Sequence, residues 1–124
     1  MCAMCCGSQL ELDNVLDDIH FVESRCGENV KHKDGVSVGE YGLTLDCLLD
    51  VNEYFGTDYK DMDRRDPVKA REIAGLYLRL MLRRFNCADF LEAAGRYHSP
   101  GNADLRKIYI KRLLRKGAKS QRKS

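Results

Sequence analysis

The sequence predicts an all-α domain, α+β at most, with no more than a small β-hairpin. Apolar residues recur at three- and four-residue intervals in five segments, which is the period of one helix face. Alternation by two residues, the pattern of a half-buried strand, is confined to a short stretch around Val36 and Val38. With 124 residues, the chain is long enough to bury one modest core.

The first predicted helix covers residues 9–25, and Gly27 marks its expected end. Residues 27–40 are rich in glycine and polar residues, so we expect a loop or a short irregular hairpin after this helix. A second helix is predicted over residues 43–55, and Gly56 is its expected end.

The clearest helix start is at Asp66-Pro67, because aspartate caps a helix N-terminus and proline fits the first helical position. This pair predicts a helix over residues 67–84. Two more helices are predicted over residues 88–97 and 103–116, with a tight Pro-Gly turn between them. The predicted core residues of the five helices are Leu12, Val15, Leu16, Ile19, Val22, Leu43, Cys47, Leu48, Val51, Tyr54, Phe55, Ile73, Leu76, Tyr77, Leu80, Met81, Phe90, Leu91, Ala94, Leu105, Ile108, Tyr109 and Leu113.

The domain organisation is simple, since no internal repeat or linker composition interrupts residues 9–116. We expect these residues to form one domain between two disordered ends, residues 1–8 and the basic tail 117–124. We also expect a monomer.

Charge is unevenly distributed along the chain. Residues 1–66 hold 6 Lys/Arg and 15 Asp/Glu, a net of −9, and the remainder holds 15 and 4, a net of +11, which gives +2 in total. The basic end suits weak contact with an anionic polymer. The alternative is a solvated helix face followed by a frayed tail.

The chain has no apolar run near the roughly 18 residues that cross a bilayer. Its first residues, MCAMCCGSQ, lack the basic and apolar regions of a signal peptide. We therefore predict no membrane span, and the sequence gives no export route and no localisation.

Metal and disulfide chemistry find little support in the sequence. The CxxCC motif at Cys2, Cys5 and Cys6 is half of a thiolate zinc site, but no second close pair follows. The three histidines show no ligand spacing. Without an export signal, a disulfide framework is not expected, and we predict neither a metal nor a cofactor.

Glu23 is the strongest candidate for a catalytic residue. The spacing of Leu12, Leu16 and Ile19 places Glu23 at the next core position, near the end of the first helix. Burial and the negative end of the helix dipole both disfavour an ionised carboxyl group there. A glutamic acid that stays protonated near neutral pH can act as a general acid.

Three short motifs, taken in order, resemble those of the lysozyme-like lytic transglycosylases. They are IHFVESRCGEN, which ends the first helix, then SVGEYGL, and then RYHSPGN. The similarity covers about residues 10–115 and is greatest to the small transglycosylase-like domains of phage and bacterial cell-wall enzymes. It implies a lysozyme-like helical fold.

The resemblance also implies the site residues. It makes Glu23 the catalytic acid that cleaves the bond between N-acetylmuramic acid and N-acetylglucosamine in peptidoglycan. The glycan strands would be contacted by Ser24, Ser37, Gly39, Glu40, Tyr97, His98 and Tyr109. In this family the substrate's N-acetyl group assists departure and its 6-hydroxyl closes an anhydro ring.

The chain departs from the family pattern at two points. Gly42 stands where the second motif usually has glutamine, and SPGN replaces a run of glycines in the third. A catalytically silent carbohydrate-binding or structural module is therefore one alternative. A small basic helical nucleic-acid binder is another, supported by the charge asymmetry alone.

A hydrolase would need a second carboxylate within about 10 Å of Glu23, for which Asp34 and Glu40 are the candidates.

Overall fold

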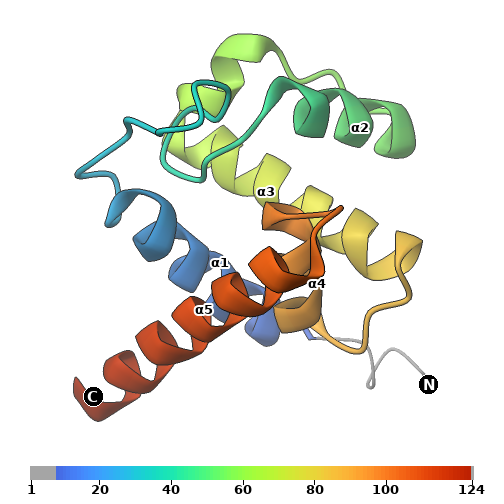
Figure 1. Ribbon diagram of the computed structural model, residues 1–124. Coiled ribbons are helices and arrows are strands. Elements are labelled where there is room, and N and C mark those ends of the chain that lie inside the picture. The colour runs from blue at the N-terminus through green and yellow to red at the C-terminus, as the bar shows by residue number, and fades with distance from the viewer. Residues whose placement is uncertain (1–7, 124) are drawn as a thin grey trace.

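The computed structural model describes the backbone of residues 8–123 and the side chains of residues 8–115 (Figure 1). It confirms the all-α class. Its helices are α1 (Gln9–Ser24), α2 (Leu45–Phe55), the 3-10 helix η2 (Asp61–Arg65), α3 (Pro67–Arg84), α4 (Phe90–His98) and α5 (Ala103–Lys123). The predicted hairpin is reduced, within the described residues, to a single bridge between Val38 and Leu43.

Side-chain caps fix where the helices begin. The side chains of Ser8, Thr44, Asp66 and Asp89 each accept a hydrogen bond from a backbone N–H in the first turn of the helix that follows. α3 therefore begins at the proline that the sequence indicated. α2 and α4 each begin two residues later than predicted, because Thr44 and Asp89 are the residues that cap them.

α1 ends one residue earlier than predicted, at Ser24 rather than at residue 25. Gly27 is not the terminator, because Arg25 already adopts the left-handed conformation, with φ of 52°. The N–H groups of Arg25 and Cys26 bond back to Phe21 and His20 carbonyl oxygens at 2.7 and 3.2 Å. The chain thus turns away immediately after the Glu-Ser pair.

α3 is the central helix, with α2, η2 and α4 packed against it, while α5 packs across α1 and α4 (Figure 1). Most of the predicted core is buried, including Ile19, Leu80 and Tyr109. Tyr54, Leu105 and Ile108 are instead about half exposed, at 49%, 47% and 55%.

Leu105 and Ile108 lie on α5, so only part of the core face predicted for this helix is confirmed. α5 buries Tyr109 and Leu113. Its approach to α4 depends on Gly95, where an added Cβ would lie 3.0 Å from the Ile110 side chain.

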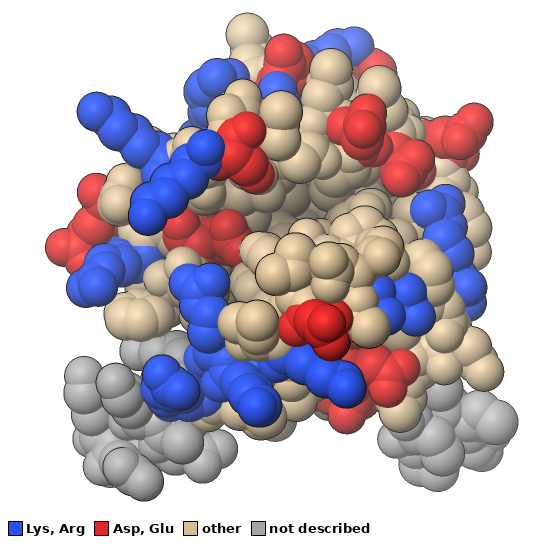
Figure 2. Space-filling model, viewed as in Figure 1, with Lys and Arg blue, Asp and Glu red and all other residues tan. Residues whose placement is uncertain are grey.

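α5 also continues to Lys123 rather than ending near residue 116. The residues after that point are mostly good helix formers, with Gly117 the main exception. Lys and Arg side chains gather along α5 in the lower part of Figure 2, whereas several Asp and Glu side chains gather around α2. This is the charge asymmetry that the sequence indicated.

η2 was not predicted, because its sequence, DMDRR, is polar apart from Met62 and shows no apolar periodicity. Its position is fixed by Arg64, which is 6% exposed and donates a hydrogen bond to the Leu43 carbonyl oxygen at 3.1 Å. Arg64 also pairs with Asp61. A buried arginine therefore fastens η2 to the bridge that follows α1.

The predictions for residues 1–7, namely N-terminal disorder and the CxxCC motif, lie outside the described residues. Among residues 8–123, no helix has the length and apolar character needed to cross a bilayer.

Candidate active site

A cavity of about 610 Å³ lies between the C-terminal end of α1, the loop that follows it, the end of α4 and one face of α5. We call it the Glu23 cavity. Its lining residues are Val22, Glu23, Asn29, Lys31, His32, Lys33, Asp34, Ser37, Gly42, Thr44, Tyr97, His98 and Arg112. Four predicted site residues, Glu23, Ser37, Tyr97 and His98, therefore meet in one place.

Glu23 is held at the inner side of this cavity with its side chain 14% exposed. The Tyr109 hydroxyl donates a hydrogen bond to Glu23 Oε2 at 2.8 Å. Burial raises the pKa of this carboxyl above its ordinary value, although the Tyr109 hydrogen bond and the nearby His32 lower it in part. Glu23 therefore holds its proton more tightly than an exposed glutamate does.

Gly42 lies directly against Glu23. A Cβ added to Gly42 would be 2.4 Å from Glu23 Oε1, and Gly42 has φ of +62°, where glycine is favoured. The glutamine of the family motif would therefore collide with the acid in this arrangement. The departure at position 42 has a local steric reason.

Asp34 is the second carboxylate of the cavity, and its pKa is shifted down, whereas that of Glu23 is shifted up. Its oxygens accept hydrogen bonds from the Ser37 hydroxyl at 2.6 Å and from the N–H groups of Ser37 and Val36 at 2.9 and 3.0 Å. These bonds lower the pKa of Asp34 to about 2. One carboxyl in the cavity is therefore ionised while the other is driven towards its neutral form.

Tyr97 and His98 form the wall contributed by α4. The Tyr97 hydroxyl donates to the Tyr41 carbonyl oxygen at 2.6 Å, which ties α4 to the loop. The His98 ring stacks on Tyr109, with centroids 4.1 Å apart and planes at 12°. Burial lowers the pKa of His98, so this ring favours its neutral form.

Ser24, Gly39 and Glu40 do not line the cavity, contrary to the contacts implied by the resemblance. Ser24 is 2% exposed, and its hydroxyl lies 2.8 Å from the Glu40 carbonyl oxygen. The Glu40 carboxylate is instead 2.5 Å from His20 Nε2. These residues hold the loop to the end of α1, which leaves Asp34 as the candidate second carboxylate.

Tyr109 also lies outside the lining set, and it reaches the site through its bond to Glu23. Sequence reasoning did not assign a role to His32, Lys31, Lys33 or Arg112, all of which line the cavity. The sequence could have indicated Arg112, because it lies three residues after Tyr109 and so on a neighbouring part of the same helix face. No sequence pattern indicated that the loop residues would line the cavity.

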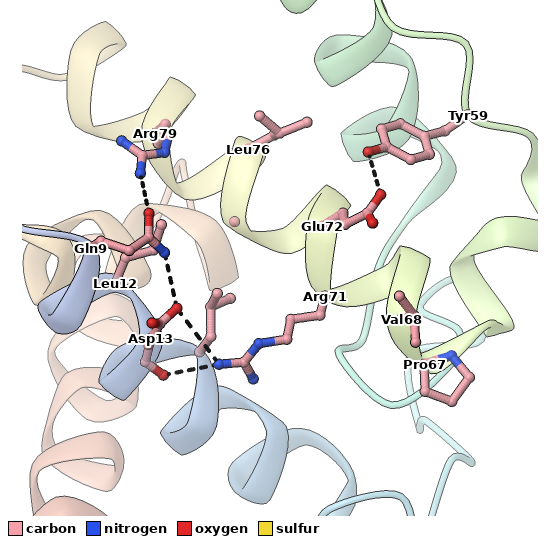
Figure 3. A pocket seen from close by; sticks show the side chains of 12 residues that line it. Gln9, Leu12, Asp13, Tyr59, Pro67, Val68, Arg71, Glu72, Leu76 and Arg79 are labelled. Carbon is pink, nitrogen blue, oxygen red and sulfur yellow. Dashed lines mark hydrogen bonds and ion pairs between the residues drawn. The ribbon is translucent and has the colours of Figure 1, made fainter.

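A second cavity, of about 590 Å³, lies between α1 and α3 (Figure 3). Leu12, Leu16 and Leu76 contribute its apolar lining. Its polar groups bond to one another: Tyr59 to Glu72, Arg79 to Gln9, and Arg71 to Asp13 and Asp17. With its polar groups bonded in this way and its apolar lining, this cavity offers fewer reactive groups than the Glu23 cavity.

Metal binding gains no support from the described residues, among which no three His, Cys, Asp or Glu side chains are grouped to hold an ion. No protein-family model, curated protein or solved structure matches the chain. The Glu23 cavity combines a carboxyl group of raised pKa, a carboxylate of lowered pKa and an aromatic wall.

Replacing Tyr109 with phenylalanine is expected to raise the pKa of Glu23 further, because it removes a hydrogen bond that favours the carboxylate. Glu23 already binds its proton more tightly in the folded protein, so the free energy of unfolding falls as pH rises from 4.5 through the raised pKa. In Tyr109→Phe this fall extends to higher pH, and the lost bond costs about 1 kcal/mol.

NMR titration of the Glu23 carboxyl carbon and denaturation at several pH values measure both effects. Tyr97→Phe is the matched control, since its hydroxyl bonds to a backbone carbonyl oxygen rather than to Glu23. Equal Glu23 titrations in the wild type and in Tyr109→Phe would contradict the assigned hydrogen bond.

Proposed function

We propose that this protein is a lysozyme-like glycosidase that cleaves peptidoglycan between N-acetylmuramic acid and N-acetylglucosamine, in the manner of a lytic transglycosylase. The observation that carries the proposal is Glu23, a carboxyl group that lines a cavity of about 610 Å³ and whose pKa is raised by burial. A protonated carboxyl that faces such a cavity is what general-acid cleavage of a glycosidic bond needs.

In the first step, the Glu23 proton passes to the glycosidic oxygen while the bond from that oxygen to the sugar C1 breaks. The carbonyl oxygen of the substrate's N-acetyl group bonds to C1 and balances the charge left there. In the second step, the sugar's 6-hydroxyl oxygen bonds to C1 and displaces the acetamido oxygen. Its proton returns to the Glu23 carboxylate, so the acid is regenerated.

The remaining cavity residues position the sugar. Tyr97 and His98 offer an aromatic wall on which a sugar ring can stack. The Ser37 hydroxyl already donates to Asp34, so its free lone pairs serve as an acceptor. Lys31, Lys33 and Arg112 make the mouth of the cavity cationic, which suits the carboxylates of stem peptides on the glycan.

The experiment is incubation of the purified protein with peptidoglycan, followed by mass analysis of the released fragments. We expect anhydro-muropeptides from the wild type and none from Glu23→Gln. Glu40→Gln is the matched control, because its carboxylate pairs with His20 away from the cavity, and it should keep the activity. Equal release by wild type and Glu23→Gln would exclude the proposal.

The Asp34→Asn variant distinguishes a transglycosylase mechanism from a hydrolase mechanism. Anhydro products that persist in this variant support the transglycosylase mechanism, which uses one carboxylate. Hydrolysed products that disappear in it would indicate a hydrolase in which Asp34 activates water.

A catalytically silent carbohydrate-binding module is the second candidate, favoured by Gly42 in place of the motif glutamine. Its signature is peptidoglycan binding that survives Glu23→Gln, with no product from either protein. The nucleic-acid alternative predicts instead a salt-sensitive binding that is indifferent to Glu23.

A further inference from the structure

His32 lies close to both Glu23 and the turn formed by residues 39–42, and its side chain is 9% exposed. Its Nε2 atom is 2.8 Å from the carbonyl oxygen of Gly39. Since a carbonyl oxygen only accepts hydrogen bonds, Nε2 carries a proton and donates it. The other nitrogen, Nδ1, is 3.9 Å from Glu23 Oε1.

The two oxygens of Glu23 therefore have different surroundings. Oε2 accepts the hydroxyl proton of Tyr109, whereas Oε1 faces His32 Nδ1 and the backbone of Gly42. A Cβ at position 42 would meet both side chains, at 2.4 Å from Glu23 Oε1 and 3.3 Å from His32 Cε1. Oε1 is thus the oxygen left to exchange a proton with a bound substrate.

We propose that His32 is a positioning residue for Glu23, which bonds to the Gly39 carbonyl oxygen of the 39–42 turn and keeps its Nδ1 atom beside Glu23 Oε1. A neutral His32 presents the Nδ1 lone pair, which is compatible with a protonated carboxyl. A proton on Nδ1 makes the ring a cation that favours the carboxylate. This inference rests on the proposed function for its catalytic meaning but not for its test.

Other groups also act on Glu23, and none duplicates His32. From α5, Tyr109 donates its hydroxyl proton and Arg112 favours the carboxylate. From the loop, the negative charge of Asp34 disfavours the Glu23 carboxylate. From α4, His98 stacks on Tyr109. Of these groups, His32 is the one that bonds to the Gly39 carbonyl oxygen and also lies 3.9 Å from Glu23 Oε1.

The first experiment is direct titration of the Glu23 carboxyl carbon by NMR in the wild type, His32→Gln and His32→Leu. Glutamine can keep a donor to the Gly39 carbonyl oxygen but cannot carry the charge. We expect the pKa of Glu23 to rise in both variants, because an attractive charge is lost. Only His32→Leu should also alter the amide signals of the 39–42 turn.

His20→Gln is the matched control, since His20 pairs with Glu40 rather than with Glu23. It should leave the titration of Glu23 unchanged. An unchanged Glu23 pKa in a folded His32→Gln would overturn the proposal, and so would an equal shift in His20→Gln. None of these measurements needs glycan cleavage, so failure of the proposed function and failure of this inference are distinguishable.

If the wild type cleaves peptidoglycan, a second measurement applies. The alkaline limb of the rate against pH should move to higher pH in His32→Gln, because the general acid keeps its proton longer. In His32→Leu, kcat should fall by up to about 10²-fold, the cost of moving a catalytic group by roughly 1 Å. A change in KM alone, with kcat and the pH profile unaltered, would assign His32 to substrate binding instead.

Discussion

If the protein cleaves glycan as proposed, glutamine at position 42 is expected to slow cleavage strongly, although the lytic transglycosylase motif that the sequence resembles usually carries glutamine there. The new Cβ would lie 2.4 Å from Glu23 Oε1 and 3.0 Å from its carboxyl carbon. Glu23 has to move, and displacing a catalytic group by about 1 Å costs roughly 10²-fold in rate. Product release from peptidoglycan measures the loss.

Gly56→Gln is the control for this substitution. Gly56 has φ of +69°, close to the +62° of Gly42, but an added Cβ there meets no atom within 4 Å. Both variants therefore carry the same left-handed strain, about 1 kcal/mol, and only one of them displaces the acid. Higher activity in Gly42→Gln than in the wild type would show that Glu23 does not act from the position described.

Alanine at position 39 is expected to destabilise the whole domain. Gly39 has φ of +78°, and its added Cβ would lie 2.1 Å from the carbonyl oxygen of Arg64 and 3.1 Å from the carbonyl carbon. These are backbone atoms, so no side-chain rotation relieves the contact. The loop and η2 must separate, and we expect a loss of roughly 3 kcal/mol from strain and overpacking together.

Chemical denaturation measures this loss, and Gly56→Ala supplies the strain without the collision. That control should cost about 1 kcal/mol. Equal stabilities of the two alanine variants would mean that η2 does not press on Gly39 in solution. The Val38–Leu43 bridge should also open in Gly39→Ala, because Arg64 would lose its bond to the Leu43 carbonyl oxygen.

The fold class and the order of the helices followed from periodicity and capping, and α3 shows why. Its Asp66-Pro67 start and its buried Leu80 are local signals that tertiary packing only reinforces. η2 could not be predicted, because it depends on Arg64 reaching a carbonyl oxygen 21 residues away. Leu105 and Ile108 were wrongly predicted to be buried for a similar reason, since the rotation of α5 is set by tertiary contacts such as that at Gly95.

The candidate site was predictable where a residue continues a helix pattern. Glu23 stood out as a carboxyl group in a core position, and its raised pKa agrees with that prediction. His32 and Lys31 were not predictable, because a glycine-rich loop has no periodicity that fixes where side chains point. Ser24 and Glu40 were assigned to substrate by motif, yet hydrogen bonding turns them towards the interior of the loop.

The hydrogen bond between Tyr109 and Glu23 joins residues 86 positions apart. Closing so long a loop carries an entropic cost, which the packing of α5 against α1 and α4 offsets. If α5 detaches while the remainder stays folded, water reaches the carboxyl of Glu23 and the cause of its raised pKa is removed. Local opening of α5 would therefore return Glu23 to the acidity of an exposed glutamate before the domain as a whole unfolds.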